Sequence, residues 1–463
     1  MWFSKQGDVL VSMLHSRTFR ILLLLLAIVP KVSFADLFTA TQFYQQQNYA
    51  KAYGEFYKLA EVGNGDAIYN LAVMSLHGQG TEKNLSLAYA YFTIAAEYGI
   101  AESLKTAQII ATQYPDKQAL QQVLEQKRAQ FGYPHLSQKY EPNFSDIEIK
   151  DKSIDKVYEK LPTYPEQAAR QGLEGWVWLE FDVGITGAVK NIKVIDSYPK
   201  NIFTSALVNA VSIWRYQPNS EKKNHSLVYH FTTFKGKEYQ RTLGFQQKDY
   251  HNEIKRHIDA AEQGNAQVQY YVANWLSSDE YNASQLLKYH WRDDTAHLTM
   301  LLAAAKNNYP IAQYKLAIEL ISNNPSAEQF KVAVNWLYQS AQSFAPAQYK
   351  LATLYADANN ELFAPHRATH WYELAGAHDK RAAKALAMHL FKYSPKSLDI
   401  GKWLETALEN DNSDPELLLL KAKLTKPKDP RKAIRIAKAA LSKAQERNWD
   451  TTLIQTFLGK SEP

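Results

Sequence analysis

The chain has 463 residues, of which 46% are hydrophobic and 22% charged, so we expect a globular protein of several domains and not a disordered one. It carries 53 Lys and Arg against 47 Asp and Glu, and this surplus is too small over such a length to predict nucleic-acid binding. No cysteine is present, which excludes disulfides, thiol chemistry and a lipid anchor on cysteine.

Residues 1–35 have the pattern of a secretory signal peptide. Arg17 and Arg20 precede an apolar run from Ile21 to Val29, and Ser33-Phe34-Ala35 offers small residues for cleavage after Ala35. As a helix the apolar run would span about 14 Å, at roughly 1.5 Å per residue, whereas a bilayer core is about 30 Å thick. We therefore expect cleavage and export. The alternative is an uncleaved membrane anchor.

A repeated helical pattern follows the signal, and we assign it to residues 36–131. One set of positions recurs at an offset of 36: Ala52, Tyr53, Phe56, Ala60 and Gly63 return as Ala88, Tyr89, Phe92, Ala96 and Gly99. Small residues at helix crossings, with aromatic residues in the next gap, are typical of stacked helical hairpins. The ending Ala95-Ala96-Glu97-Tyr98-Gly99 resembles the Sel-one-like class of tetratricopeptide-related repeats. Residues 132–154, with Pro134 and Pro142, are predicted to be an irregular linker.

The central stretch, residues 155–240, changes from helical periodicity to alternation. Residues 176–183 place four apolar side chains on one face and two tryptophans and two carboxylates on the other, which predicts a strand. Gly187 favours a turn with positive φ, as we also expect a turn at Gly175. A second strand, an amphipathic helix that ends before Pro218 and a third strand give the order β-β-α-β. Trp176 and Trp178 are expected to cover a sheet face, to meet a neighbouring repeat or to bind a partner.

The fold-defining positions of this stretch are Gly175, Phe181, Gly187, Trp214, Arg215, Tyr216 and Pro218. Together with Tyr164 and Pro165, they resemble the C-terminal domain of the TonB family. The resemblance implies a periplasmic domain that grips the N-terminal "box" of a TonB-dependent outer-membrane receptor and relays energy from an inner-membrane motor component. It leaves open whether the chain is free in the periplasm or anchored in the inner membrane. Arg215 and Tyr216 either orient a partner or serve packing and helix-end charge.

The expected binding surface is the open edge of the small sheet. An edge strand offers unpaired N–H and C=O groups to which an extended peptide can add as a further strand. We predict that this edge is the closing strand, Ser226 to Phe234, together with the approach from Leu161 to Pro165. The predicted partner-binding residues are Tyr164, Pro165, Ser226, Leu227, Val228, Tyr229, His230, Phe231 and Thr232.

Helical repeats resume in residues 250–460. Ala312-Gln313-Tyr314-Lys315-Leu316-Ala317 reappears at 347–352, and Ala333 and Trp336 reappear as Ala368 and Trp371, all at an offset of 35. The predicted fold class is therefore α+β and multidomain, in which a solenoid of helical hairpins flanks a small β-β-α-β domain of the TonB C-terminal type.

No active site is predicted, because no nucleophile elbow, metal-protease motif or phosphate loop occurs. His366 and His370 have helical metal-ligand spacing, but we interpret them as structural residues of a repeat, and we expect no cofactor, no metal and no enzyme. The predicted function is binding of a receptor peptide in energy-coupled transport, such as siderophore uptake. The alternative is a periplasmic scaffold for protein–protein interactions in the envelope, with no role in energy transduction.

Overall fold

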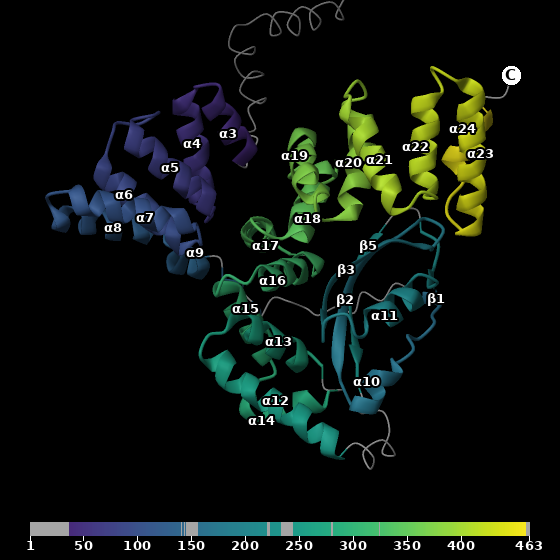
Figure 1. Cartoon of the computed structure of the whole chain (residues 1–463), viewed down its shortest axis with the longest axis horizontal. Helices are drawn as coiled ribbons and strands as arrows, with labels where there is room; N and C mark the ends of the chain where they lie inside the picture. The colour runs from purple at the N-terminus through teal and green to yellow at the C-terminus, as the bar shows by residue number, and fades with distance from the viewer. Residues whose placement is uncertain are drawn as a thin grey trace, which may run out of the picture.

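The computed structural model describes residues 37–139, 141–142, 144, 156–219, 223–232, 244–278, 281–323 and 325–459. The predicted signal peptide lies outside these residues. Figure 1 shows two helical arrays, with a small sheet held against the inner side of the larger, C-terminal array. Within the described part of the chain, no helix has both the length and the apolar character that a membrane crossing requires.

The N-terminal array contains the first predicted repeats. Its helices are α3 (Leu37–Gln45), α4 (Tyr49–Ala60), α5 (Gly65–His77), α6 (Leu85–Glu97), α7 (Ala101–Gln113), α8 (Lys117–Phe131) and α9 (Tyr133–Lys139). The two sequence copies occupy α4 and α6, where Ala52 and Ala88 are fully buried at the helix crossings. Gly63 and Gly99 follow these helices with φ of +81° and +91°, which favours glycine over residues with a Cβ.

Helix α9 forms where an irregular linker was predicted, so that prediction is wrong for residues Tyr133–Lys139. Leu136 is buried, and the Tyr133 ring lies 5.4 Å from that of Tyr98. Tertiary packing therefore outweighs Pro134, which sits in the first turn, where a missing N–H removes no helical bond. Tyr133 Oη also donates to the carbonyl of Ala305 at 2.9 Å and so links the two arrays.

The C-terminal array wraps around the sheet. Its helices are α12 (Gly244–Glu262), α13 (Ala266–Leu276), α14 (Asn282–His290), α15 (Ala296–Lys306), α16 (Pro310–Ser322), α17 (Ala327–Ala341), α18 (Ala345–Ala356), α19 (Pro365–Gly376), α20 (Lys380–Tyr393), α21 (Asp399–Asn410), α22 (Pro415–Thr425), α23 (Pro430–Glu446) and α24 (Thr452–Gly459). The copies at an offset of 35 occupy α16 and α18, and α17 and α19. Ala312 and Ala347 are fully buried at equivalent crossings.

The sheet has three antiparallel strands in the order β3-β2-β5. The central strand β2 (Gly175–Val183) pairs with β3 (Val189–Tyr198) and with β5 (Lys223–Phe231). Helices α10 (Glu166–Gln171) and α11 (Thr204–Val211) cover one face, whose core includes Phe181, Leu207 and Trp214. The β-β-α-β order is found, with one addition: the short strands β1 (Lys156–Tyr158) and β4 (Arg215–Tyr216) pair beside it.

Two of the glycines in this domain allow close approaches of the backbone. Gly187 lies in the β2–β3 turn with φ of +79°, as predicted, and a Cβ there would come within 1.9 Å of the Tyr216 carbonyl oxygen. Gly175 begins strand β2 and is not a turn residue, so that expectation is wrong. A Cβ on Gly175 would lie 1.8 Å from the Tyr198 carbonyl oxygen, which explains why glycine is needed in a strand.

We predict that Gly187→Ala destabilises the protein by about 2–4 kcal/mol, because it combines a positive φ with a backbone clash. Urea unfolding followed by circular dichroism measures this change. Gly54→Ala is the matched control: a Cβ there meets no atom within 4 Å in helix α4, so we expect it to be neutral or to stabilise by up to about 1 kcal/mol. Equal stabilities of the two variants would contradict the account of Gly187.

Candidate functional site

Strand β5 is an outer strand of the sheet, as the sequence predicted. It runs from Lys223 to Phe231, three residues earlier than expected; Thr232 follows it, and residues 233 and 234 lie outside the described range. No strand of the described chain pairs with its outer side. Leu227, Tyr229 and Phe231 pack into the core below α11, whereas Val228 packs against the C-terminal array. Both faces of β5 are therefore supported by packing.

The predicted approach segment meets the end of β5. The ring of Tyr164 lies 5.9 Å from that of Phe231 and 5.4 Å from that of Phe203, and its hydroxyl donates to the Leu173 carbonyl. Pro165 directly precedes helix α10. The structure thus brings Tyr164 to Phe231 as a packing neighbour, whereas Leu161, 68% exposed, lies near Ala206 and Asn209 of the α11 helix.

The residues after α11 are mainly structural. Trp214 is buried, and its Nε1 donates to the Lys160 carbonyl at 2.9 Å. Tyr216 is buried, its ring lies 5.6 Å from that of His225, and burial, with a contribution from Glu159, raises the pKa of its hydroxyl. Of the two readings for Arg215 and Tyr216, packing therefore accounts for Tyr216. Arg215 stays partly exposed.

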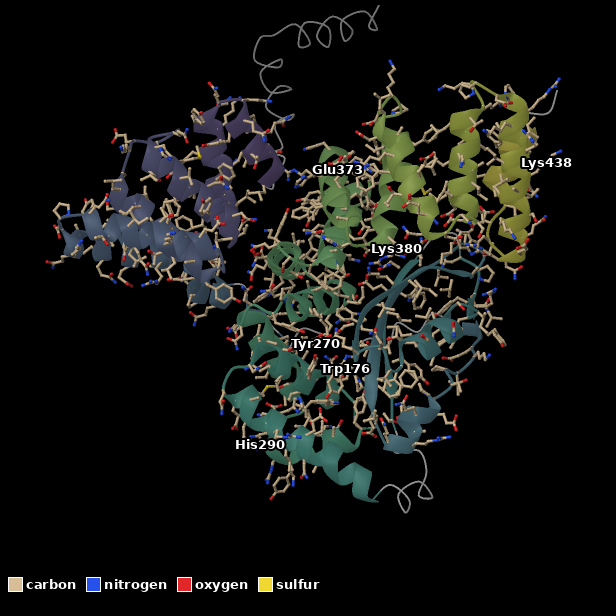
Figure 2. The ribbon with its side chains drawn as sticks, in the orientation of Figure 1. Trp176, Tyr270, His290, Glu373, Lys380 and Lys438 are labelled. Carbon is tan, nitrogen blue, oxygen red and sulfur yellow. The ribbon has the colours of Figure 1, made fainter. Side chains whose placement is uncertain are left out.

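The second face of the sheet is filled by the C-terminal array. Trp176 and Trp178 are at most 1% exposed. The Trp176 ring lies 5.7 Å from that of Trp275 on α13, and Figure 2 shows it beside Tyr270. The Trp178 ring stacks on Tyr314 of α16 at 5.5 Å. Of the three roles expected for the tryptophans, the structure shows contact with a neighbouring repeat.

A buried ionic cluster joins this face to the array. Arg381 of α20 donates to Glu180 of β2 at 3.0 Å and to Asp379 at 2.9 Å, and its guanidinium lies 4.4 Å from the centre of the Tyr349 ring. The Tyr314 hydroxyl also donates to Glu180. Burial, and then the Glu180 charge, raise the pKa of Tyr314. Tyr314 and Tyr349 are equivalent positions of the repeat, so the repeated sequence supplies the contact surface.

The last helices hold the opposite end of the sheet. Lys190 of β3 lies 3.1 Å from Glu416, which also pairs with Lys384 at 2.8 Å. In the β2–β3 turn, Thr186 Oγ1 donates to the Asn448 carbonyl at 2.7 Å. The sheet domain is therefore held at both ends by one curved array.

These contacts were missed in the sequence. One sequence signal could have indicated them. Glu180 and Asp182 lie on a strand face that also carries two tryptophans, and two indoles on one face indicate that the face is buried and that its carboxylates have partners. Their partners lie more than a hundred residues away, so no local pattern identified Arg381. Around His366 and His370, and elsewhere in the described residues, no group of three or more His, Asp or Glu side chains is arranged to hold a metal ion.

The matches to known families agree with this architecture of helical arrays around a small sheet domain. Residues 160–234 match the family model described as the Gram-negative bacterial TonB protein C-terminal, and residues 65–99 and 345–380 match the Sel1 repeat. The chain thus carries a TonB C-terminal domain between Sel1 repeats, and neither match is to an enzyme family.

Curated relatives match a short part of the chain. Protein TonB of Escherichia coli K12 is 39% identical over 57 residues, which cover 12% of this chain and 24% of that protein. Protein TonB of Yersinia enterocolitica is 31% identical over 61 residues, 13% and 24% respectively. That of Pseudomonas aeruginosa is 30% identical over 70 residues, 15% and 20%. The chain spans about a quarter or less of the length of these relatives.

Solved structures resemble the chain only loosely. A protective antigen of uropathogenic Escherichia coli strains that displays an SLR fold covers 91% of this chain and 70% of its own, at 15% identity and a TM-score of 0.34. The match to yeast Tom70 covers 93% of this chain and 84% of Tom70, at 11% identity and a TM-score of 0.27. Likeness at this level does not bear on function.

We predict that Arg381→Met destabilises the protein by about 3–5 kcal/mol, because it leaves Glu180 buried without its charge partner. The matched control is Lys331→Met, which removes an exposed pair with Glu328 and should cost at most about 1 kcal/mol. Combining Arg381→Met with Glu180→Gln should recover the part of the loss that is due to Glu180, whereas buried Asp379 still lacks its Arg381 partner. Thermal unfolding measures all three; a cost for Arg381→Met no larger than that of the control would refute the role of the cluster.

His230 gives the stability a pH dependence. The Tyr281 hydroxyl donates to the Gly175 carbonyl, so His230 Nδ1, 2.5 Å away, donates to Tyr281. Burial, and then the charge of Lys315, lower the pKa of His230 to about 4. Between pH 6.5 and 4 the unfolded chain therefore binds more protons at this residue than the folded chain, and its contribution to stability is lost as the pH falls through this window.

From pH 7 to pH 5 we expect His230 to remove about 2 kcal/mol of the free energy of unfolding, at roughly 1.4 kcal/mol per unit of pKa difference. His230→Gln should lose this part of the pH dependence, whereas His135→Gln, on the exposed side of α9, should keep it. Urea unfolding at the two pH values measures the difference. An unchanged slope in His230→Gln would contradict the prediction.

Proposed function

We propose that this protein binds the N-terminal segments of TonB-dependent outer-membrane receptors by strand addition at β5, and so assists energy-coupled transport such as siderophore uptake. The observation that carries the proposal is the outer position of β5 in a sheet domain that matches the TonB C-terminal family model. A receptor peptide would pair with Ser226 to Thr232 and approach Tyr164 and Pro165 at the end of the strand.

The packing of β5 suits this role. Strand addition draws its affinity from main-chain hydrogen bonds and its selectivity from alternate side-chain pockets. Because one face of β5 packs on the domain core and Val228 on the other face packs on the array, the strand is already ordered. A preformed edge saves the entropy of ordering that a flexible segment would lose on binding.

The C-terminal array would act as a rigid support for the receptor-binding domain. A pull on a peptide paired to β5 would pass through β2 into Trp176, Trp178 and the Glu180–Arg381 pair, and from there into α13, α16 and α20. Such a buried interface resists separation far better than a flexible linker. We infer that the domain and the array move as one body under load.

Energy coupling also requires a motor component in the inner membrane. The TonB relatives match this chain over about a quarter of their length, so their link to a motor cannot be carried over by similarity. We propose that the protein works in the periplasm, and that an anchored inner-membrane component docks onto the repeats. The N-terminal array suits this task, because it projects away from the sheet (Figure 1).

That projecting array also favours the second candidate, a periplasmic scaffold with no part in energy transduction. Solenoids of this kind present extended surfaces to other proteins. In this case the sheet domain would serve as a structural core of the C-terminal array. The two candidates differ in whether the edge of β5 meets a receptor peptide.

A cysteine crosslink tests the edge directly, since the chain has no native cysteine. We predict that Ser226→Cys, at an exposed residue of β5, forms a disulfide with a single-cysteine peptide from a receptor's N-terminal box, and that the yield depends on the cysteine's register in the peptide. Ile202→Cys, 40% exposed but outside β5, is the control and should give background yield. The yield is read on a non-reducing gel; equal yields at the two sites would favour the scaffold.

Proline substitutions provide a second control on the same edge. Alternate N–H groups of a strand point to opposite sides, so Val228→Pro and Tyr229→Pro remove groups from different sides of β5. One variant should damage the pairing with β2 and lower the melting temperature strongly. The other should keep the fold and abolish peptide binding. If the variant that keeps the fold still binds the peptide, β5 is not the binding strand.

A further inference from the structure

Two adjoining cavities lie between the sheet domain and the last helices. The first, of about 620 Å³, is bounded by β3, α20 and residues 407–417 and 446–449. The second, of about 680 Å³, is bounded by Val157, Tyr216 and residues 445–451. Arg215 and Trp449 line both cavities, which makes them two chambers of one groove. We call it the junction groove; it lies on the β3 side of the sheet, away from β5.

The charged residues that line the first chamber are mostly basic. Of the described residues that line it, six are basic and three are acidic. The basic residues are Lys190, Arg215, Lys380, Arg381, Lys384 and Arg447, and the acidic ones are Asp411, Asp414 and Glu446. In the second chamber Arg215 is the single charged residue among the described lining residues.

Most of these cations are already neutralised, and two are not. Lys384 is 2.6 Å from Asp414, Lys190 is 3.1 Å from Glu416, and Arg447 is 2.6 Å from Asp411. By contrast, no ion pair of Arg215 or Lys380 is found among the residues that the structure describes. The Arg215 guanidinium donates to the carbonyl of its own neighbour, Trp214. Figure 2 shows Lys380 where α20 meets the sheet.

Apolar surface accompanies the two cations. Val157 is 59% exposed in the second chamber, and Ile213 is 38% exposed in the first. Trp449 lines both chambers. Apolar contacts interspersed with single charges suit a polypeptide with alternating apolar and acidic side chains better than a uniformly charged polymer. Each chamber also has the volume of a typical ligand pocket.

We propose that the junction groove binds an extended acidic peptide segment of a partner protein. Its carboxylates pair with Arg215 and Lys380, and its apolar side chains contact Val157 and Ile213. A peptide in this position contacts both the sheet domain and the last helices, so its binding requires that the two are packed together. The site is independent of β5, so a receptor segment and this peptide can be bound together.

The experiment uses the full chain and two labelled hexapeptides that alternate valine with glutamate or valine with glutamine. We expect fluorescence anisotropy at 50 mM salt to show the glutamate peptide binding at least about fivefold more tightly. Combining Arg215→Gln with Lys380→Gln should weaken its binding about fivefold. Lys438→Gln, on α23 well away from the groove (Figure 2), is the charge-matched control and should have no effect.

Equal binding of the two peptides, or undiminished binding by the double variant, would overturn the proposal. A photocrosslinker at Ile213 locates the site in an otherwise unaltered chain and should capture the glutamate peptide, whereas one at Leu104, 49% exposed on α7, should not. Equal capture at both positions would also overturn it. Because Tyr229→Pro and Val228→Pro act at β5, a failure of the receptor-peptide proposal leaves these outcomes unchanged.

Discussion

The packing of two tryptophans of one strand face against the C-terminal array is the contact on which the rest of the structure depends. Each large aromatic side chain buries roughly 150–250 Å², so Trp176 and Trp178 each contribute about 4–6 kcal/mol at ~25 cal/mol per Å². Without the array, both indoles would lie on an open sheet face. The sheet and the array are therefore one folding unit in energetic terms, although they differ in sequence character.

The charged residues of that face set the register of the contact. Taking Glu180 and Arg381 out of water costs free energy that their attraction only roughly repays, so the pair adds little net stability. The pair instead determines the register of β2 against the array, because a slip of the strand by one residue would leave both charges buried and unpaired. Tyr314 and Tyr349, from equivalent repeat positions, complete the cluster. The repeat that stacks on its neighbours thus also carries residues that position the domain.

The sequence predicted what local periodicity encodes and missed what depends on distant partners. The offsets of 36 and 35 residues located the helices, and the alternation along residues 176–183 located β2 and its buried face. The outer position of β5 followed from the strand order. Three features could not be predicted: helix α9, the strand position of Gly175 and the short pair of β1 and β4. Each depends on contacts with residues that are distant in the sequence. The same holds for the junction groove, whose walls come from residues 157 to 451.

With one face of the sheet in its own core and the other against the array, side-chain recognition on a flat sheet surface is no longer available. What remains are the strand edges and the seams where the domain meets the array. A strand edge can bind the main chain of an extended polypeptide, and the junction groove, lined by Arg215, Lys380 and Trp449, can bind its charged side chains. By covering the sheet, the curved array therefore directs a partner of the sheet domain toward extended segments and away from folded surfaces. This constraint follows from the packing of the sheet, and it applies to a receptor segment at β5 and to a peptide in the junction groove.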